Sequence, residues 1–100
     1  MRILSLIFIV SILSADNSGS LIKATAALNA GMFEEALVHI DKAQKESPTN
    51  PDVHQMKALL HEALDETEDA LESWKKCLEY SKDKKVKREA RIHIRILSEE

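Results

Sequence analysis

The sequence predicts an all-α fold in which antiparallel helix pairs stack into a short solenoid. Ala, Leu, Glu and Lys abound while aromatic residues make up only 4% of the chain, and these abundant residues favour helices. Only 2 Gly and 2 Pro are present, which disfavours a turn-rich all-β fold. Two segments also match when the sequence is shifted so that Ala36 falls on Ala70. This repeat shift is about 34 residues, a period found in helical repeat proteins. A chain of 100 residues has room for one small domain.

Residues 1–15 are expected to form a secretory signal peptide. Arg2 gives a positive start, residues 3–13 are almost wholly apolar, and small residues follow up to Ala15, which is the pattern of an exported chain. The apolar run is about half of the ~20 residues that a helix needs to cross a bilayer. An uncleaved anchor and a buried N-terminal helix are the alternatives. We expect cleavage after Ala15 and a mature protein that is secreted, into the periplasm or outside the cell.

The first two helices are expected over residues 19–30 and 33–46. Gly31 separates them, because glycine readily takes the left-handed conformation that closes a helix. The second helix carries apolar residues at positions 36, 37, 40 and 43, a helical spacing that gives one apolar stripe. The segment 47–51, which contains both prolines, ends this helix.

Three more helices are expected over residues 51–64, 67–80 and 84–98. Asn50 can cap the first of these, and Pro51 can occupy its opening turn. Asp65, which the repeat shift aligns with Gly31, is a permitted substitute for glycine in the left-handed conformation. The 67–80 helix follows from its match to the 33–46 helix, and the last from apolar residues that recur every three or four positions.

At several positions the repeat shift pairs small residues with small residues and bulky with bulky, whereas Leu28 falls on Glu62 and Phe33 on Thr67. The matching pairs are Ala24 with Ala58, Ala36 with Ala70, Leu37 with Leu71, Ile40 with Trp74, and Ala43 with Cys77. Small residues let neighbouring helices approach closely, and Ile40 and Trp74 then fill the space between repeats. We therefore expect Trp74 to be buried against the last helix and Cys77 to be an inert thiol of the core.

The stretch from Gly31 through Ala43 to Pro48, and again the stretch 69–78, closely resembles the second helix of the tetratricopeptide repeat family. The resemblance covers about residues 18–81. It implies a helical domain over 16–100, with repeats at about 17–50 and 51–82 and a capping helix at about 84–98. Ser20 and His54 stand where the family usually has a large aromatic residue early in the first helix.

Proteins that this chain resembles hold peptides or partner proteins in the groove formed by their first helices. Here the matching residues would be Leu21, Thr25, Gln55, Leu59 and Glu62. The resemblance therefore implies a non-catalytic scaffold that binds a protein or peptide in the cell envelope. A structural subunit that self-associates through its unfinished repeat ends is the alternative.

The last helix is expected to be an interaction surface as well as a cap. Its basic stripe consists of Lys84, Lys87, Arg88, Arg91 and Arg95, and the face that can cover the second repeat consists of Val86, Ala90, Ile94 and Leu97. Ile92 and Ile96 widen the apolar surface to roughly 200°, about twice what a solvated cap needs. We expect this pair to meet a second copy, a partner helix or a membrane surface; packing against the outer edge of the second repeat is the alternative.

No catalytic, metal or cofactor site is expected. His61 and Asp65 are four residues apart, but a second histidine at the spacing of a zinc helix is missing. The acidic run over 62–72 is expected to be a solvated turn rather than a calcium site. A net charge of −3 predicts no general affinity for nucleic acid.

Overall fold

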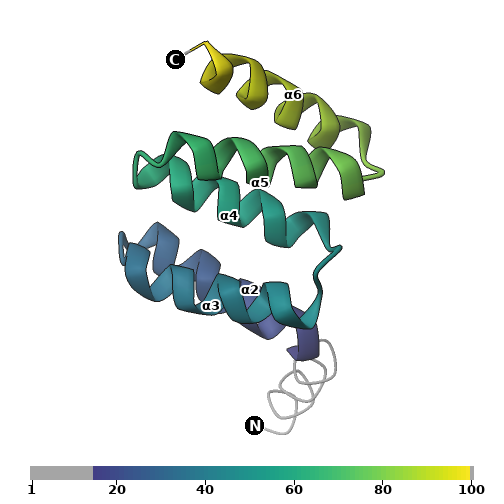
Figure 1. Ribbon diagram of the computed structural model, residues 1–100. Coiled ribbons are helices and arrows are strands. Elements are labelled where there is room, and N and C mark those ends of the chain that lie inside the picture. The colour runs from purple at the N-terminus through teal and green to yellow at the C-terminus, as the bar shows by residue number, and fades with distance from the viewer. Residues whose placement is uncertain (1–14, 100) are drawn as a thin grey trace, which may run out of the picture.

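The computed structural model of the protein describes residues 15–99, which form five helices. They are α2 (Ala15–Asn29), α3 (Phe33–Glu46), α4 (Pro51–Ala63), α5 (Thr67–Tyr80) and α6 (Lys84–Ser98). They stack in chain order, with the α2 and α3 pair at one end and α6 at the other (Figure 1). Each helix packs mainly against its neighbours in the chain, and α2 also packs against α4. The expected all-α fold is confirmed.

The helix bounds agree closely with those expected from the sequence. The bounds of α3, α5 and α6 are the expected ones, and α4 ends one residue earlier. The first helix differs most, because the backbone is already helical at Ala15, four residues before the expected start. The predicted signal peptide lies outside the described residues except for Ala15. No helix among residues 15–99 is both long and apolar enough to cross a membrane.

The turns inside the two helix pairs are built in the same way. Gly31 has φ 77° and Asp65 has φ 61°, so both predicted left-handed residues are confirmed. The amide that follows each of them closes the helix end, from Met32 to the Ala27 carbonyl and from Glu66 to the His61 carbonyl, each at 2.8 Å. This is the Schellman arrangement, which satisfies carbonyl groups that the helix leaves unpaired.

Side-chain caps fix the starts of α4 and α6. The Asn50 side chain accepts from the Asp52 amide at 2.9 Å, with Pro51 in the first turn. The Asp83 side chain accepts from the Lys85 amide at 2.8 Å. Such caps satisfy amides that have no partner within the helix. They fix the residues at which α4 and α6 begin.

Two hydrophobic clusters share α4 between them. Val53 and Leu60 of α4 belong to the first cluster, which they form with residues of α2 and α3. Ala58 belongs to the second cluster, which it forms with residues of α5 and α6. Ile40 and Trp74, which the repeat shift pairs, are both 0% exposed. The expected burial of Trp74 against the last helix is therefore confirmed, because residues of α6 lie in the same cluster. The other pairs are also buried, apart from the leucines at 37 and 71, which are partly buried.

His54 contacts both the turn before α4 and the end of α5. It is buried, its ring lies 5.4 Å from the Tyr80 ring, and its Nε2 lies 2.7 Å from the Pro48 carbonyl oxygen. A carbonyl oxygen only accepts hydrogen bonds, so the bond requires that Nε2 carry a proton. Burial, opposed in part by this bond, lowers the pKa of His54 from its ordinary value.

This lowered pKa predicts an acid-sensitive fold. The unfolded chain binds a proton at His54 at higher pH than the folded chain does, so the free energy of unfolding falls as pH drops through the ordinary histidine range, about 6.5. We expect the melting temperature to fall more between about pH 7.5 and 5 in the wild type than in His54→Gln. Equal slopes in wild type and His54→Gln would contradict this reading.

Candidate partner-binding face

An open, mainly aliphatic groove lies between α2 and α4. Its volume is about 560 Å³. The lining residues are Leu21, Ile22, Thr25, Ala26, Asn29, Asp52, Gln55 and Met56. The Thr25 hydroxyl donates to the Leu21 carbonyl at 2.8 Å, so its proton is already bonded within α2. Two helices that are distant in sequence thus form one concave surface lined by both apolar and polar side chains.

Three of the five groove residues expected from the sequence line this groove. They are Leu21, Thr25 and Gln55. Leu59 is partly buried against the second cluster, and Glu62 is engaged by α5 and α6. The groove also includes Ile22, which is 64% exposed and which sequence reasoning missed. The sequence feature that could have predicted Ile22 as a groove residue is its position next to Leu21.

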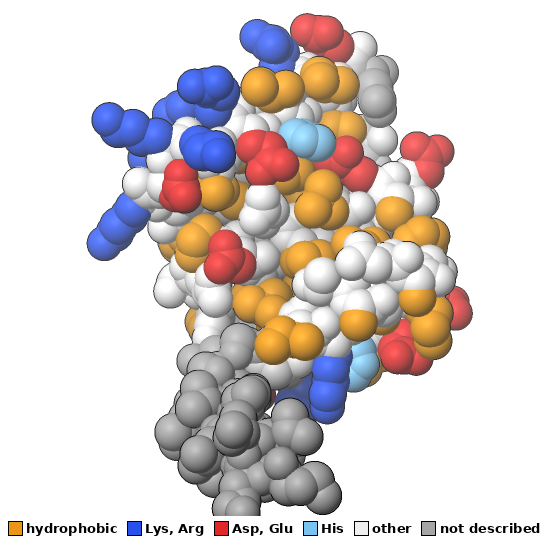
Figure 2. All heavy atoms as spheres, turned by 180° about the vertical axis from the view of Figure 1, so that it is seen from behind, with side chains coloured by type: hydrophobic (Ala, Val, Ile, Leu, Met, Phe, Trp, Pro, Cys, Tyr) orange, Lys and Arg blue, Asp and Glu red, His pale blue; other side chains and the backbone are white. Residues whose placement is uncertain are grey.

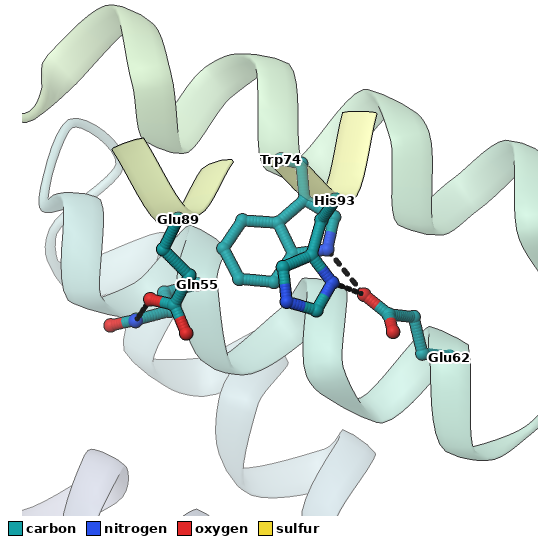
Figure 3. Close-up of polar contacts among 5 residues, drawn as sticks. All are labelled: Gln55, Glu62, Trp74, Glu89 and His93. Atoms are coloured by element: carbon teal, nitrogen blue, oxygen red, sulfur yellow. Dashed lines mark hydrogen bonds and ion pairs between the residues drawn. The ribbon is translucent and has the colours of Figure 1, made fainter. Parts of the chain in front are cut away.

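Glu62 joins three helices. Its Oε2 accepts from Trp74 Nε1 at 2.5 Å and lies 2.8 Å from His93 Nδ1. The His93 ring stacks on the Trp74 ring, with centroids 4.3 Å apart. Figure 3 shows both rings directed at the Glu62 carboxylate of α4. Such a carboxylate accepts from two donors at once, so Glu62 fixes the position of α6.

A second polar bridge joins α4 to α6 and follows the repeat shift. Gln55 Nε2 donates to Glu89 Oε1 at 2.5 Å (Figure 3). Leu21 and Gln55 are one repeat shift apart, and so are Gln55 and Glu89. Glu89 of α6 is therefore related to Gln55 of α4 by the same shift that relates Gln55 to Leu21 of α2. The same shift aligns Leu59 with His93. The repeat shift could therefore have predicted that Glu89 and His93 of α6 lie beside α4.

The predicted two-sided character of α6 is present in the structure. Ala90 and Leu97 are buried, and Val86 and Ile94 pack against the same cluster. The basic residues Lys84, Arg88, Arg91 and Arg95 are exposed, and Lys87 is half-buried. Figure 2 shows Lys and Arg side chains gathered at the α6 end of the molecule. Ile92 and Ile96 are 39% and 52% exposed, so a large part of each side chain lies in solvent.

His61 is buried, and its partner is Glu66 rather than Asp65. Its Nδ1 lies 2.7 Å from Glu66 Oε1, whereas Asp65 is occupied with the turn itself. Ligand atoms of His61, Glu66 and Asp69 lie within 4.8 Å of one another, so these three could present one nitrogen and two oxygens to a cation. Both acids are exposed. The hydrogen bond between His61 and Glu66 accounts for their closeness without a metal.

Cys77 is an unreactive thiol of the core, as expected. It is 0% exposed, and burial, helped by the carboxylates of Glu89 and Asp52, raises the pKa of its thiol to about 11. At neutral pH the thiol therefore keeps its proton, and the reactive thiolate is scarce.

No protein-family model, no curated protein and no solved structure matches this chain. The groove, the polar bridges to α6 and the exposed side of α6 are therefore interpreted from their own geometry.

Proposed function

We propose that the protein is a non-catalytic scaffold of tetratricopeptide type that holds a protein or peptide segment in the cell envelope. The groove between α2 and α4 carries this proposal. It is concave, lies on the first helix of each pair, and combines aliphatic side chains with amide and carboxylate groups. Such a surface suits a segment with one or two apolar side chains and a backbone that Asn29, Asp52 and Gln55 can hydrogen-bond.

Two exposed residues of nearly equal character test the groove. Ile22, which lines it, and Val38 of α3, which does not, are 64% and 66% exposed. Ile22→Glu is expected to abolish capture of the partner from solubilised cell envelopes, because a carboxylate would be desolvated on binding. Val38→Glu is the control and should capture the same protein as the wild type. Equal capture by both variants would exclude the groove.

Export is proposed from the N-terminal pattern of Arg2, the apolar run 3–13 and Ala15. We expect N-terminal sequencing of protein from its natural source to begin near Asp16. A reading that begins at Met1 and Arg2 would contradict cleavage.

A second function, self-association, is favoured by a different observation. The exposed side of α6 carries two isoleucines and a row of cations, and this side takes no part in the groove between α2 and α4.

A further inference from the structure

The outer face of α6 is defined here by Lys84, Arg88, Ile92, Arg95 and Ile96. At 100° per residue, Ile92 and Ile96 point about 160° and 120° away from the buried Ala90. They are 39% and 52% exposed. The outer face therefore turns away from the second cluster and presents two large apolar side chains to solvent.

The cations of α6 have no hydrogen-bond or ion-pair partner among the residues that the structure describes. The helix contains six Lys or Arg residues and one acidic residue, Glu89, which is bonded to Gln55. Among residues 15–99, none of the six cationic side chains forms a hydrogen bond or an ion pair. Like charges three and four positions apart on a helix repel, so the isolated molecule keeps this repulsion.

A complementary group of acids lies beside the other end of α6. The acidic turn consists of the exposed residues Asp65, Glu66, Glu68, Asp69 and Glu72. Leu97, near the end of α6, lines the same small hollow as Asp65 and Glu66. The cations are densest at the start of α6, over 84–91. One end of the helix is thus basic, and the other adjoins acids.

We propose that a second copy of this chain covers the outer face of α6, with the two α6 helices antiparallel about a two-fold axis. Ile92 and Ile96 of both copies form the centre of this interface. The basic start of each α6 then extends past the end of the other, towards the acidic turn of the second copy. Such an interface is closed, because each copy uses the same surface. It does not depend on the proposed groove.

The cations of α6 and the acidic turn disfavour any partner on the outer face of α6 other than a second copy. An anionic membrane would attract the start of α6 but repel the acidic turn at its other end. An acidic protein partner would satisfy the cations and leave the acidic turn unpaired. A parallel pair of α6 helices would set one basic start beside the other. The antiparallel second copy pairs both groups of charges and also covers both isoleucines.

Sedimentation equilibrium of the purified protein tests the interface. We expect about twice the mass of the single chain, with the dissociation constant rising at least tenfold when salt is raised from about 0.05 to 0.5 M, because screening weakens the charge pairs. The double variant Ile92→Glu, Ile96→Glu should be monomeric with an unchanged circular dichroism spectrum. Val38→Glu and Ile22→Glu are controls that should remain dimeric, whether or not Ile22→Glu captures a partner.

Charge exchange between two variants identifies the partner as a second copy. Glu68 and Glu72 are one helical turn apart near the start of α5. Leu71, three residues after Glu68, packs in the cluster shared with α6. The variant Lys84→Glu, Arg88→Glu and the variant Glu68→Lys, Glu72→Lys should each be monomeric alone. Mixed in equal amounts, they should form a heterodimer, because every charge pair is again opposite in sign.

Three results would overturn the proposal. The first is a monomeric wild type, whether or not it binds vesicles containing phosphatidylserine. If the monomer did bind such vesicles, the outer face of α6 would be assigned to lipid. A dimer that survives Ile92→Glu, Ile96→Glu but is lost in Val38→Glu would place the contact at the other end of the molecule. A mixture of the two charge variants that stays monomeric would exclude the antiparallel pairing. If the isoleucine variant does not fold, the charge variants decide alone.

Discussion

Replacing Trp74 with alanine is expected to lower the free energy of unfolding by about 3–5 kcal/mol. The indole is fully buried in the cluster that joins α4, α5 and α6. Its removal leaves a cavity there and takes away both the stacking partner of His93 and one of the two donors to Glu62. For a domain of this size, the loss corresponds to at least ~12 °C in melting temperature, and it approaches the whole stability of a small domain.

Thermal melts followed by circular dichroism measure this effect. Trp74→Phe is the matched control, because it keeps a ring beside His93 and loses only the Nε1 donor and part of the volume. We expect its loss to be clearly smaller than that of Trp74→Ala. If Trp74→Ala melted within a few degrees of the wild type, the indole would not hold α6 in place, and the pairing of Trp74 with Ile40 by the repeat shift would be wrong.

Leu60→Lys is expected to unfold the protein, whereas Leu59→Lys is expected to leave it folded. Leu60 is 1% exposed in the first cluster, and a buried ammonium without a partner costs several kcal/mol. Leu59 is only partly buried, so a lysine there can keep its stem against the second cluster and its charge in water. Melting curves of the two variants make the comparison.

The folded Leu59→Lys variant also reports on binding. Leu59 was expected from the sequence to contact a partner, but it does not line the groove between α2 and α4, so binding in that groove alone predicts unchanged partner capture by this variant. Weaker capture would show that the binding face extends along α4 beyond the groove. Leu59→Met is the control that keeps the volume and the apolar character. If Leu59→Lys unfolded the protein while Leu60→Lys did not, the facing of α4 would be the reverse of that described.

The fold was largely predictable because local signals agreed with one another. The end of the first helix pair was marked by Asn50 and Pro51, and the turns by Gly31 and Asp65. The start of α2 was not predictable. The segment 16–19 consists of Asp, Asn, Ser and Gly, residues that favour helix ends and turns, yet its backbone is helical. Propensity is a weak prior that the surrounding structure can override.

The candidate site was only partly predictable. Leu21, Thr25 and Gln55 could be placed because residues related by the repeat shift fall on the same face. The bridges of Glu62 to His93 and of Gln55 to Glu89 depend on the angle and depth at which α6 docks, which a helical pattern does not fix. The repeat shift carried some of this information, since it reaches past the second repeat into α6.

The sharing of α4 between two clusters has a consequence for how the chain folds. Nearly all packing joins helices that are adjacent in sequence, so little loop entropy is lost before contacts form, and folding is expected to be fast. Neither cluster is complete without α4, which couples the two and makes the middle of the chain the last part to open. α2 and α6 each face solvent on one side and can separate first. Local opening will therefore begin at the two ends, and a partner bound at either end would slow it.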